Sequence, residues 1–124
     1  MVVGIESVTL HSKSAKALAD FYRDKVGLKL TIEAEMGEGM DVFGFGMDGA
    51  DLYIISNPKV VGKNTNPDEV IFSLEVDDIE KESDRLGLAG AKKLGDFYHL
   101  EGYGYICDFE DPDGNHFRLV QVKE

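Results

Sequence analysis

Hydrophobic and polar residues alternate along several short stretches of the chain, and two other stretches follow a helical spacing. The alternation over residues 4–11 predicts a strand with Val8 and Leu10 on one face. Apolar residues recur every three or four positions over residues 15–25, which predicts an amphipathic helix that ends at Gly27 in a left-handed conformation. The inward face of this helix consists of Ala15, Leu18, Phe21, Tyr22 and Lys25.

Three further strands are expected in the first half, at residues 28–33, 41–47 and 51–56, with a glycine-containing loop over residues 35–40 between the first two. In the second half we expect a strand over residues 70–76 and a helix that begins with a capping box of Asp77 and Glu80. This helix ends at Gly87 or Gly90, and the last strand, residues 115–122, follows a DPDG turn.

The two halves repeat each other at an offset of 64 residues, which places Leu10 on Leu74 and Asp20 on Asp84. A strand–helix–strand unit cannot bury its apolar face alone, so two copies indicate a paired architecture with a shared cleft. The pattern predicts an α+β fold with two βαβββ modules in a single domain, residues 1–124. Module one spans about residues 1–57, a linker about 58–68, and module two about 69–124.

Composition narrows the class of protein. With 43% hydrophobic residues the chain is expected to be globular. No apolar run approaches the length needed to span a bilayer, and no secretory signal is visible in the sequence. The single cysteine excludes an internal disulfide and fits a reducing cytosol, so we expect a cytoplasmic protein. A net charge of −11 argues against binding to nucleic acid or anionic membranes. The charge either favours a cationic ligand or serves only solubility.

The segments FYRDKVGLKL (residues 21–30) and DFEDPDGNHFRLVQ (residues 108–121) carry a resemblance to a known family. In this order they resemble the vicinal oxygen chelate superfamily, which includes glyoxalase I, extradiol dioxygenases and the fosfomycin and bleomycin resistance proteins. The resemblance implies that the two modules form an open barrel-like sheet, the glyoxalase/bleomycin-resistance fold. It also implies a homodimer.

Metal-dependent members of this superfamily place four ligands, usually His, Gln or Glu, on the first and last strands of each module. Counting from the motifs puts these positions at Ser7, Tyr53, Ile71 and Arg118, and the register at Tyr53 could slip to Ile54. Ile71 has no donor atom, and Arg118 stays cationic and repels a metal. The chain therefore resembles the metal-free branch, and we expect no metal, no cofactor and no catalytic residue.

Strand alternation predicts which side chains line the cleft. We expect the ligand-binding residues to be Ser7, Thr9, His11, Tyr53, Ile71, Glu75, Tyr103, His116 and Arg118, with Ile55, Ser73 and Val120 beside them. Arg118 either binds a carboxylate or phosphate of the ligand or pairs with Glu75 or another internal carboxylate. Each histidine is either a general base or a hydrogen-bonded residue of the rim.

An aromatic segment, residues 97–105, either stacks on a planar or cationic ligand or packs at an interface. The leading hypothesis is a metal-independent protein that sequesters a small molecule, cationic or aromatic, in an aromatic cleft. The alternative is a lyase or dioxygenase of the same superfamily with a non-standard metal site or a histidine base. A third hypothesis is a regulatory or structural dimer whose cleft is closed by packing.

Overall fold

The computed structural model describes residues 1–37 and 39–122, and the chain divides into two compact units, Met1–Gly62 and Lys63–Glu124. Glu38, in the loop expected over residues 35–40, lies outside the described residues. The fold is α+β, with one sheet in each unit, as the alternation of hydrophobic positions predicts.

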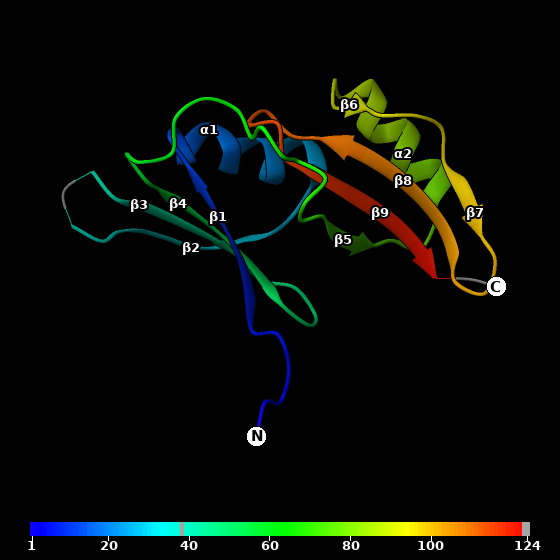
Figure 1. The fold of residues 1–124 in the computed structure, drawn as a ribbon, viewed down its shortest axis with the longest axis horizontal. Coiled ribbons are helices and arrows are strands. Elements are labelled where there is room, and N and C mark those ends of the chain that lie inside the picture. Colours follow the sequence, from blue (N-terminus) through cyan, green and yellow to red (C-terminus); the bar gives the residue numbers. More distant parts are fainter. Residues whose placement is uncertain (38, 123–124) are drawn as a thin grey trace. The chain divides into compact units, whose positions relative to one another are not determined.

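Unit one contains one helical segment and a four-stranded sheet, coloured blue to green in Figure 1. Its strands lie in the order β1-β4-β3-β2, with β1 and β4 parallel and the other neighbours antiparallel. The elements are β1 (Ser7–Ser12), α1 (Ala15–Asp20), η1 (Phe21–Val26), β2 (Leu30–Glu35), β3 (Asp41–Phe45) and β4 (Asp51–Ser56).

The helix forms where the apolar spacing predicts it, and Ala15, Leu18, Phe21 and Tyr22 are buried. From Phe21 onward the helix widens to the π form, and the carbonyl of Tyr22 accepts from the amides of both Gly27 and Leu28, at 3.0 and 2.9 Å. Gly27 has φ 92°, so the expected left-handed end is confirmed.

The helix covers one face of the sheet, where Leu52, Ile54 and Phe45 are almost fully buried. Val8 pairs with Leu52 and Leu10 with Ile54, so these side chains of β1 lie on the same face. The intervening residues of β1 and β4 therefore point to the opposite face. We call that surface the far face of unit one.

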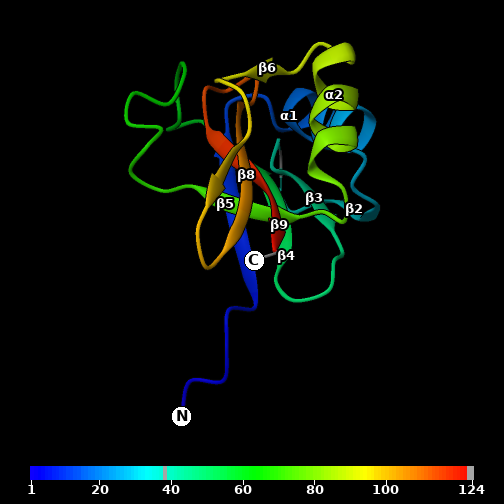
Figure 2. The same cartoon turned by 90° about the vertical axis from the view of Figure 1, so that its right-hand side faces the viewer.

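Unit two contains a helix and five strands, and Figure 2 shows α2 on one side of β8 and β9. The strand order is β5-β9-β8-β6, and β7 also pairs with β8. The elements are β5 (Phe72–Glu75), α2 (Ile79–Leu88), β6 (Lys92–Lys93), β7 (Tyr98–Leu100), β8 (Gly104–Glu110) and β9 (His116–Val122). Because β6 and β7 lie one after the other along β8, they replace the single second strand that the repeat predicts for module two.

Three phenylalanines form the centre of the helix side of this sheet. Phe117 stacks on Phe72 and Phe109, with ring centroids 6.0 and 5.7 Å away, because the three residues are direct neighbours across β5, β9 and β8. Arg118, Asp108 and Ser73 alternate with these residues, so they point to the opposite face. That surface is the far face of unit two.

Several predicted boundaries in the second half are wrong. Asp78, not Asp77, caps α2, because its Oδ1 accepts from the amide of Lys81 at 3.1 Å, and this removes the expected capping box with Glu80. Gly90 follows the end of the helix with φ 93°, so of the two expected glycines Gly90 terminates it.

The last turn forms around Asp111, whose Oδ1 accepts from the amides of Asp113 and Asn115, both at 2.9 Å. Gly114 has φ 79°, and a Cβ there would lie 3.2 Å from the Cβ of Lys63, so the turn requires glycine. None of the helices in the described part of the chain is long and apolar enough to cross a membrane.

Candidate ligand-binding faces

The ring of Tyr53 reaches over Gly44 on the far face of unit one. Thr9, Tyr53 and Gly44 are direct neighbours across β1, β4 and β3. A Cβ at Gly44 would lie only 2.9 Å from Cε1 of Tyr53 and 3.1 Å from Cβ of Ile32. The Tyr53 ring therefore lies where the side chain of residue 44 would otherwise be. Tyr53 is half-buried, and Ile32 and Ile55 lie beside it on the same face.

The other predicted residues of module one lie on the same face. Ser7 pairs with Asp51 at the start of β1, and His11 pairs with Ile55 near its end. The Nδ2 group of Asn57 donates to Nδ1 of His11 at 3.3 Å, so a neutral His11 ring carries its proton on Nε2.

In unit two, the row of residues equivalent to Thr9, Tyr53 and Gly44 contains an ion pair. Ser73, Arg118 and Asp108 are direct neighbours across β5, β9 and β8. Nε of Arg118 donates to Oδ1 of Asp108 at 2.9 Å. The side chain of Arg118 is 28% exposed and that of Asp108 is 27% exposed. The internal carboxylate that meets Arg118 is therefore Asp108. Glu75 is exposed and lies beside Val120, the second residue after Arg118 on β9.

His116 lies between two carboxylates at the start of β9. Its Nδ1 is 2.7 Å from Oδ1 of Asp68, and its Nε2 is 3.3 Å from Oε1 of Glu110. Only the doubly protonated ring can donate to both at once. Burial raises the pKa of Glu110, but hydrogen bonds from Lys92 and His116 and their charges outweigh it, so the net pKa lies below its ordinary value.

The remaining two predicted residues lie apart from these rows. Ile71 is half-buried and precedes β5, whereas the expected strand included it. Tyr103 is 41% exposed and belongs to the turn between β7 and β8, where its amide donates to the carbonyl of Leu100 at 3.0 Å. The structure thus brings Ser7, Thr9, His11 and Tyr53 together on one far face and Glu75, His116 and Arg118 on the other.

The residues present do not fit a divalent metal. Tyr53 and Arg118 occupy equivalent places in the two sheets, because Thr9 on β1 pairs with Tyr53 and Ser73 on β5 pairs with Arg118. Arg118 is a paired cation, and both ring nitrogens of His116 contact carboxylates. Across residues 1–37 and 39–122, no three His, Cys, Asp or Glu side chains are grouped so that they could hold a metal ion.

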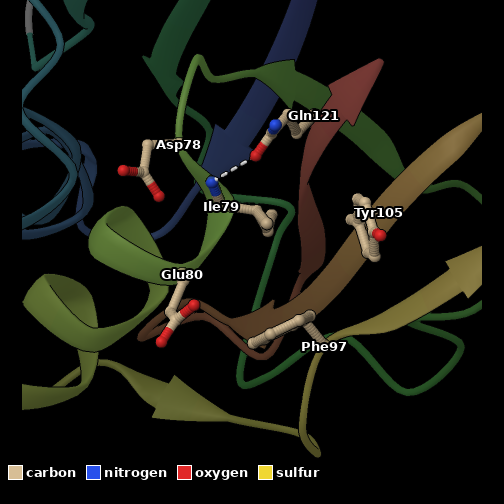
Figure 3. A pocket seen from close by; sticks show the side chains of 6 residues that line it. All are labelled: Asp78, Ile79, Glu80, Phe97, Tyr105 and Gln121. Carbon is tan, nitrogen blue, oxygen red and sulfur yellow. Dashed lines mark hydrogen bonds between the residues drawn. The ribbon is translucent and has the colours of Figure 1, made fainter. Parts of the chain in front are cut away.

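Sequence reasoning did not identify Gly44, Asn57, Asp68 and Asp108. Gly44 and Asp108 are separated by the repeat offset of 64 residues, so aligning the third strands of the modules would have indicated both. Asn57 and Asp68 lie at the two ends of the expected linker, outside the predicted strands, so strand alternation could not indicate them. A separate pocket also lies on the helix side of unit two, beside Gln121 and the start of α2 (Figure 3).

The fold, with its two helix-covered sheets and their far faces, is that of the glyoxalase class. The family model of the glyoxalase-like domain matches residues 7–120, so the chain belongs to this family, and the recognition of the vicinal oxygen chelate superfamily is confirmed. Among curated proteins, the uncharacterized protein YetH of Bacillus subtilis (strain 168) is 24% identical over 121 residues, covering 98% of this chain and 100% of YetH.

Two solved structures show the same fold. The glyoxylase/bleomycin resistance protein/dioxygenase domain from Frankia sp. EAN1pec is 15% identical, with a TM-score of 0.81 over 99% of this chain and 100% of that domain. TnmS3, an antibiotic binding protein from Streptomyces sp. CB03234, is 22% identical, with a TM-score of 0.73 over 98% of each chain. At these identities the likeness concerns the fold.

Proposed function

We propose that this protein binds a planar, aromatic small molecule without a metal and sequesters it unchanged. The observation that carries the proposal is the half-buried Tyr53 ring, which lies over Gly44 beside Ile32 and Ile55. A flat aromatic surface favours offset stacking with a planar ligand. The name of TnmS3 as an antibiotic binding protein supports the same use of this fold.

The far face of unit two, taken by itself, offers polar contacts to a ligand. Arg118 is held by Asp108 through Nε, and the residues that the structure describes show no other hydrogen bond to it. Its Nη groups are then the donors for a carboxylate or hydroxyl of the ligand. The proposed ligand contacts are Ser7, Thr9, His11, Tyr53, Ile71, Glu75, Tyr103, His116 and Arg118. We further propose that the protein acts as a homodimer.

The chemistry of the residues at the positions implied by the resemblance supports metal independence. Ile71 offers no donor atom, Arg118 is a cation paired with Asp108, and Ser7 is a neutral hydroxyl. The histidines do not compensate, because His11 bonds Asn57 and His116 bonds two carboxylates. No step that requires a metal or a histidine base is therefore included in the proposal.

Thermal unfolding of metal-stripped protein tests the absence of a metal. An ion at a hundred times its dissociation constant stabilises a protein by about 2.7 kcal/mol, which is several degrees for a domain of this size. We expect no saturable shift with magnesium, manganese, iron, nickel or zinc. A saturable shift with one of them would overturn the metal-free proposal and favour the enzymatic alternative.

Binding of aromatic antibiotics, measured by calorimetry on the same preparation, tests the ligand. We expect Tyr53→Ala to weaken binding of any hit by about 10-fold, in line with the ~0.5–1.5 kcal/mol of an aromatic pair plus lost buried area. Tyr98→Ala removes another half-exposed tyrosine, on β7, and serves as the matched control. Equal losses in both variants, or no hit among planar compounds, would contradict the proposal.

A further inference from the structure

Unit two has a pocket on the helix side of its sheet, on the surface opposite to the proposed ligand contacts Glu75, His116 and Arg118 (Figure 3). We propose that this pocket binds a small organic cation of the quaternary ammonium type. It is a second site, and it does not depend on the proposed function of the far faces. It is lined by Asp78, Ile79, Glu80, Phe97, Tyr105 and Gln121.

The start of a helix usually favours an anion, but here two amides of its first turn are already bonded to side chains. The amide of Ile79 donates to Oε1 of Gln121 at 2.8 Å, and the amide of Lys81 donates to Oδ1 of Asp78 at 3.1 Å. An incoming phosphate or carboxylate would have to displace these two bonds. These two bonds and the carboxylates of Asp78 and Glu80 make the pocket less suited to an anion than to a cation.

Two aromatic rings form one side of the pocket. The centroids of Phe97 and Tyr105 are 6.2 Å apart and their planes meet at 77°, so the rings present surfaces in two directions. His99 packs against Tyr105 at 4.8 Å from the neighbouring strand and supports it. A cation within about 6 Å of a ring centroid is attracted by the negative face of the ring.

Two carboxylates add negative charge to the same pocket. Asp78 and Glu80 come from the first turn of α2, and none of the six lining residues is basic. Figure 3 shows Glu80 and Phe97 at one end of the pocket and Gln121 at the other. An aromatic pair together with uncompensated carboxylates is the combination that recognises a permanently charged, weakly hydrated cation.

The size of the pocket limits the ligand. Its volume is about 230 Å³. Pockets for drug-sized molecules enclose about 300–1,000 Å³, so this pocket suits a smaller group such as trimethylammonium. Choline carries that group, and 3,3-dimethylbutan-1-ol has the same shape without the charge. The two compounds separate recognition of a cation from simple burial of methyl groups.

The experiment is a titration of the full-length ¹⁵N-labelled protein with each compound at constant ionic strength, followed by amide NMR. We expect choline to shift the amides of Ile79, Tyr105 and Gln121 saturably, with at least ~10-fold tighter binding than the neutral analogue. Equal binding of the two compounds would overturn the proposal. So would the absence of saturation, or shifts that occur at Thr9 and Tyr53 in place of the pocket.

Two conservative substitutions test the residues. Phe97→Leu keeps an apolar side chain but removes the ring, and Glu80→Gln keeps the shape but removes the charge. Each is expected to weaken choline binding by roughly 3- to 10-fold. Asp84→Asn removes the same charge from an exposed position of α2 outside the pocket and should change binding less than about 2-fold. If Asp84→Asn weakens binding as much as Glu80→Gln, the effect is one of net charge and the site is wrong.

Discussion

The two far faces carry equivalent rows of residues with different chemistry. In each unit, three residues on adjacent strands form such a row. A hydroxyl residue on the first strand pairs with a residue that has a long side chain on the last strand, and that residue pairs with one on the third strand of the module. The equivalent residues are Thr9 and Ser73, Tyr53 and Arg118, and Gly44 and Asp108.

The third residue of the row accounts for the difference. Gly44 has no side chain, so the ring of Tyr53 can occupy the space above it. Asp108 has a carboxylate, and Arg118 forms an ion pair with it at 2.9 Å. The equivalent positions of the two sheets therefore hold an aromatic ring over a glycine in one unit and an ion pair in the other.

The largest expected effect comes from filling the space at residue 44. Gly44→Ala places a Cβ 2.9 Å from the Tyr53 ring and 3.1 Å from Ile32, so the ring must leave its position. We expect the free energy of unfolding to fall by about 1–3 kcal/mol and binding of a planar ligand to weaken by about 10-fold. Urea unfolding and calorimetry measure the two effects.

Gly87→Ala is the control for this substitution. Gly87 lies within α2, and a Cβ there meets nothing within 4 Å. The change should stabilise the protein by up to about 1 kcal/mol, since alanine favours a helix over glycine. If Gly44→Ala behaves like Gly87→Ala, the close approach of Tyr53 to the sheet is not required.

A double-mutant cycle tests the ion pair between Arg118 and Asp108 in unit two. We expect Asp108→Asn and Arg118→Gln each to lower the free energy of unfolding by about 1 kcal/mol, because each leaves a partly buried charge without its partner. The double variant should lose about 0.5 kcal/mol less than the sum of the single losses, which is typical of a partly exposed ion pair. Strict additivity would show that the pair contributes no coupling in solution.

The pH dependence of stability tests the network around Glu110. Its pKa is lowered in the folded protein, so it stabilises the fold at pH values above its ordinary pKa of 4.5. That contribution is lost as the pH falls through the lower folded pKa. We expect Glu110→Gln to lower Tm by about 2 °C near neutral pH and to flatten the decline of Tm in acid. Glu101→Gln, in the exposed turn after β7, should leave both unchanged.

The smallest effect concerns the single cysteine, which reports on unit two alone. Burial raises the pKa of Cys107, and only the nearby charge of Lys93 opposes this, so the thiol stays protonated in the folded protein. We expect a thiol reagent at about pH 8 to label native protein at least ~100-fold more slowly than protein in urea. Rapid labelling in buffer would show that the helix side of unit two opens locally.

Hydrophobic spacing predicted much of the fold. Four residues of the predicted inward face of the first helix, its end at Gly27 and strand Asp51–Ser56 are confirmed, because burial imposes a period of 3.6 or 2 on the apolar residues; Lys25, the fifth predicted residue, is only half-buried. The start of α2 was wrong by one residue, because Asp77 and Asp78 are both capable caps. The hydrogen bond from Ile79 to Gln121, 42 residues away, is a tertiary contact that local sequence does not show.

The candidate site was predicted only in part, for a similar reason. Alternation along single strands indicated which residues share a far face, but it left the partner of Arg118 open among several carboxylates. Asp108 is the partner because β8 lies next to β9 at that register, which is a property of the sheet. The break between β6 and β7 and the close approach at Gly44 also depend on neighbouring strands.

The most direct test of the central claim is amide NMR of EDTA-treated ¹⁵N-labelled protein against a panel of planar aromatic antibiotics. We predict that a binding compound shifts the amides of Thr9, Gly44 and Tyr53, with an affinity that added zinc or manganese does not change. The claim would be contradicted if binding required a divalent metal, or if Tyr53→Ala left the affinity of the compound unaltered.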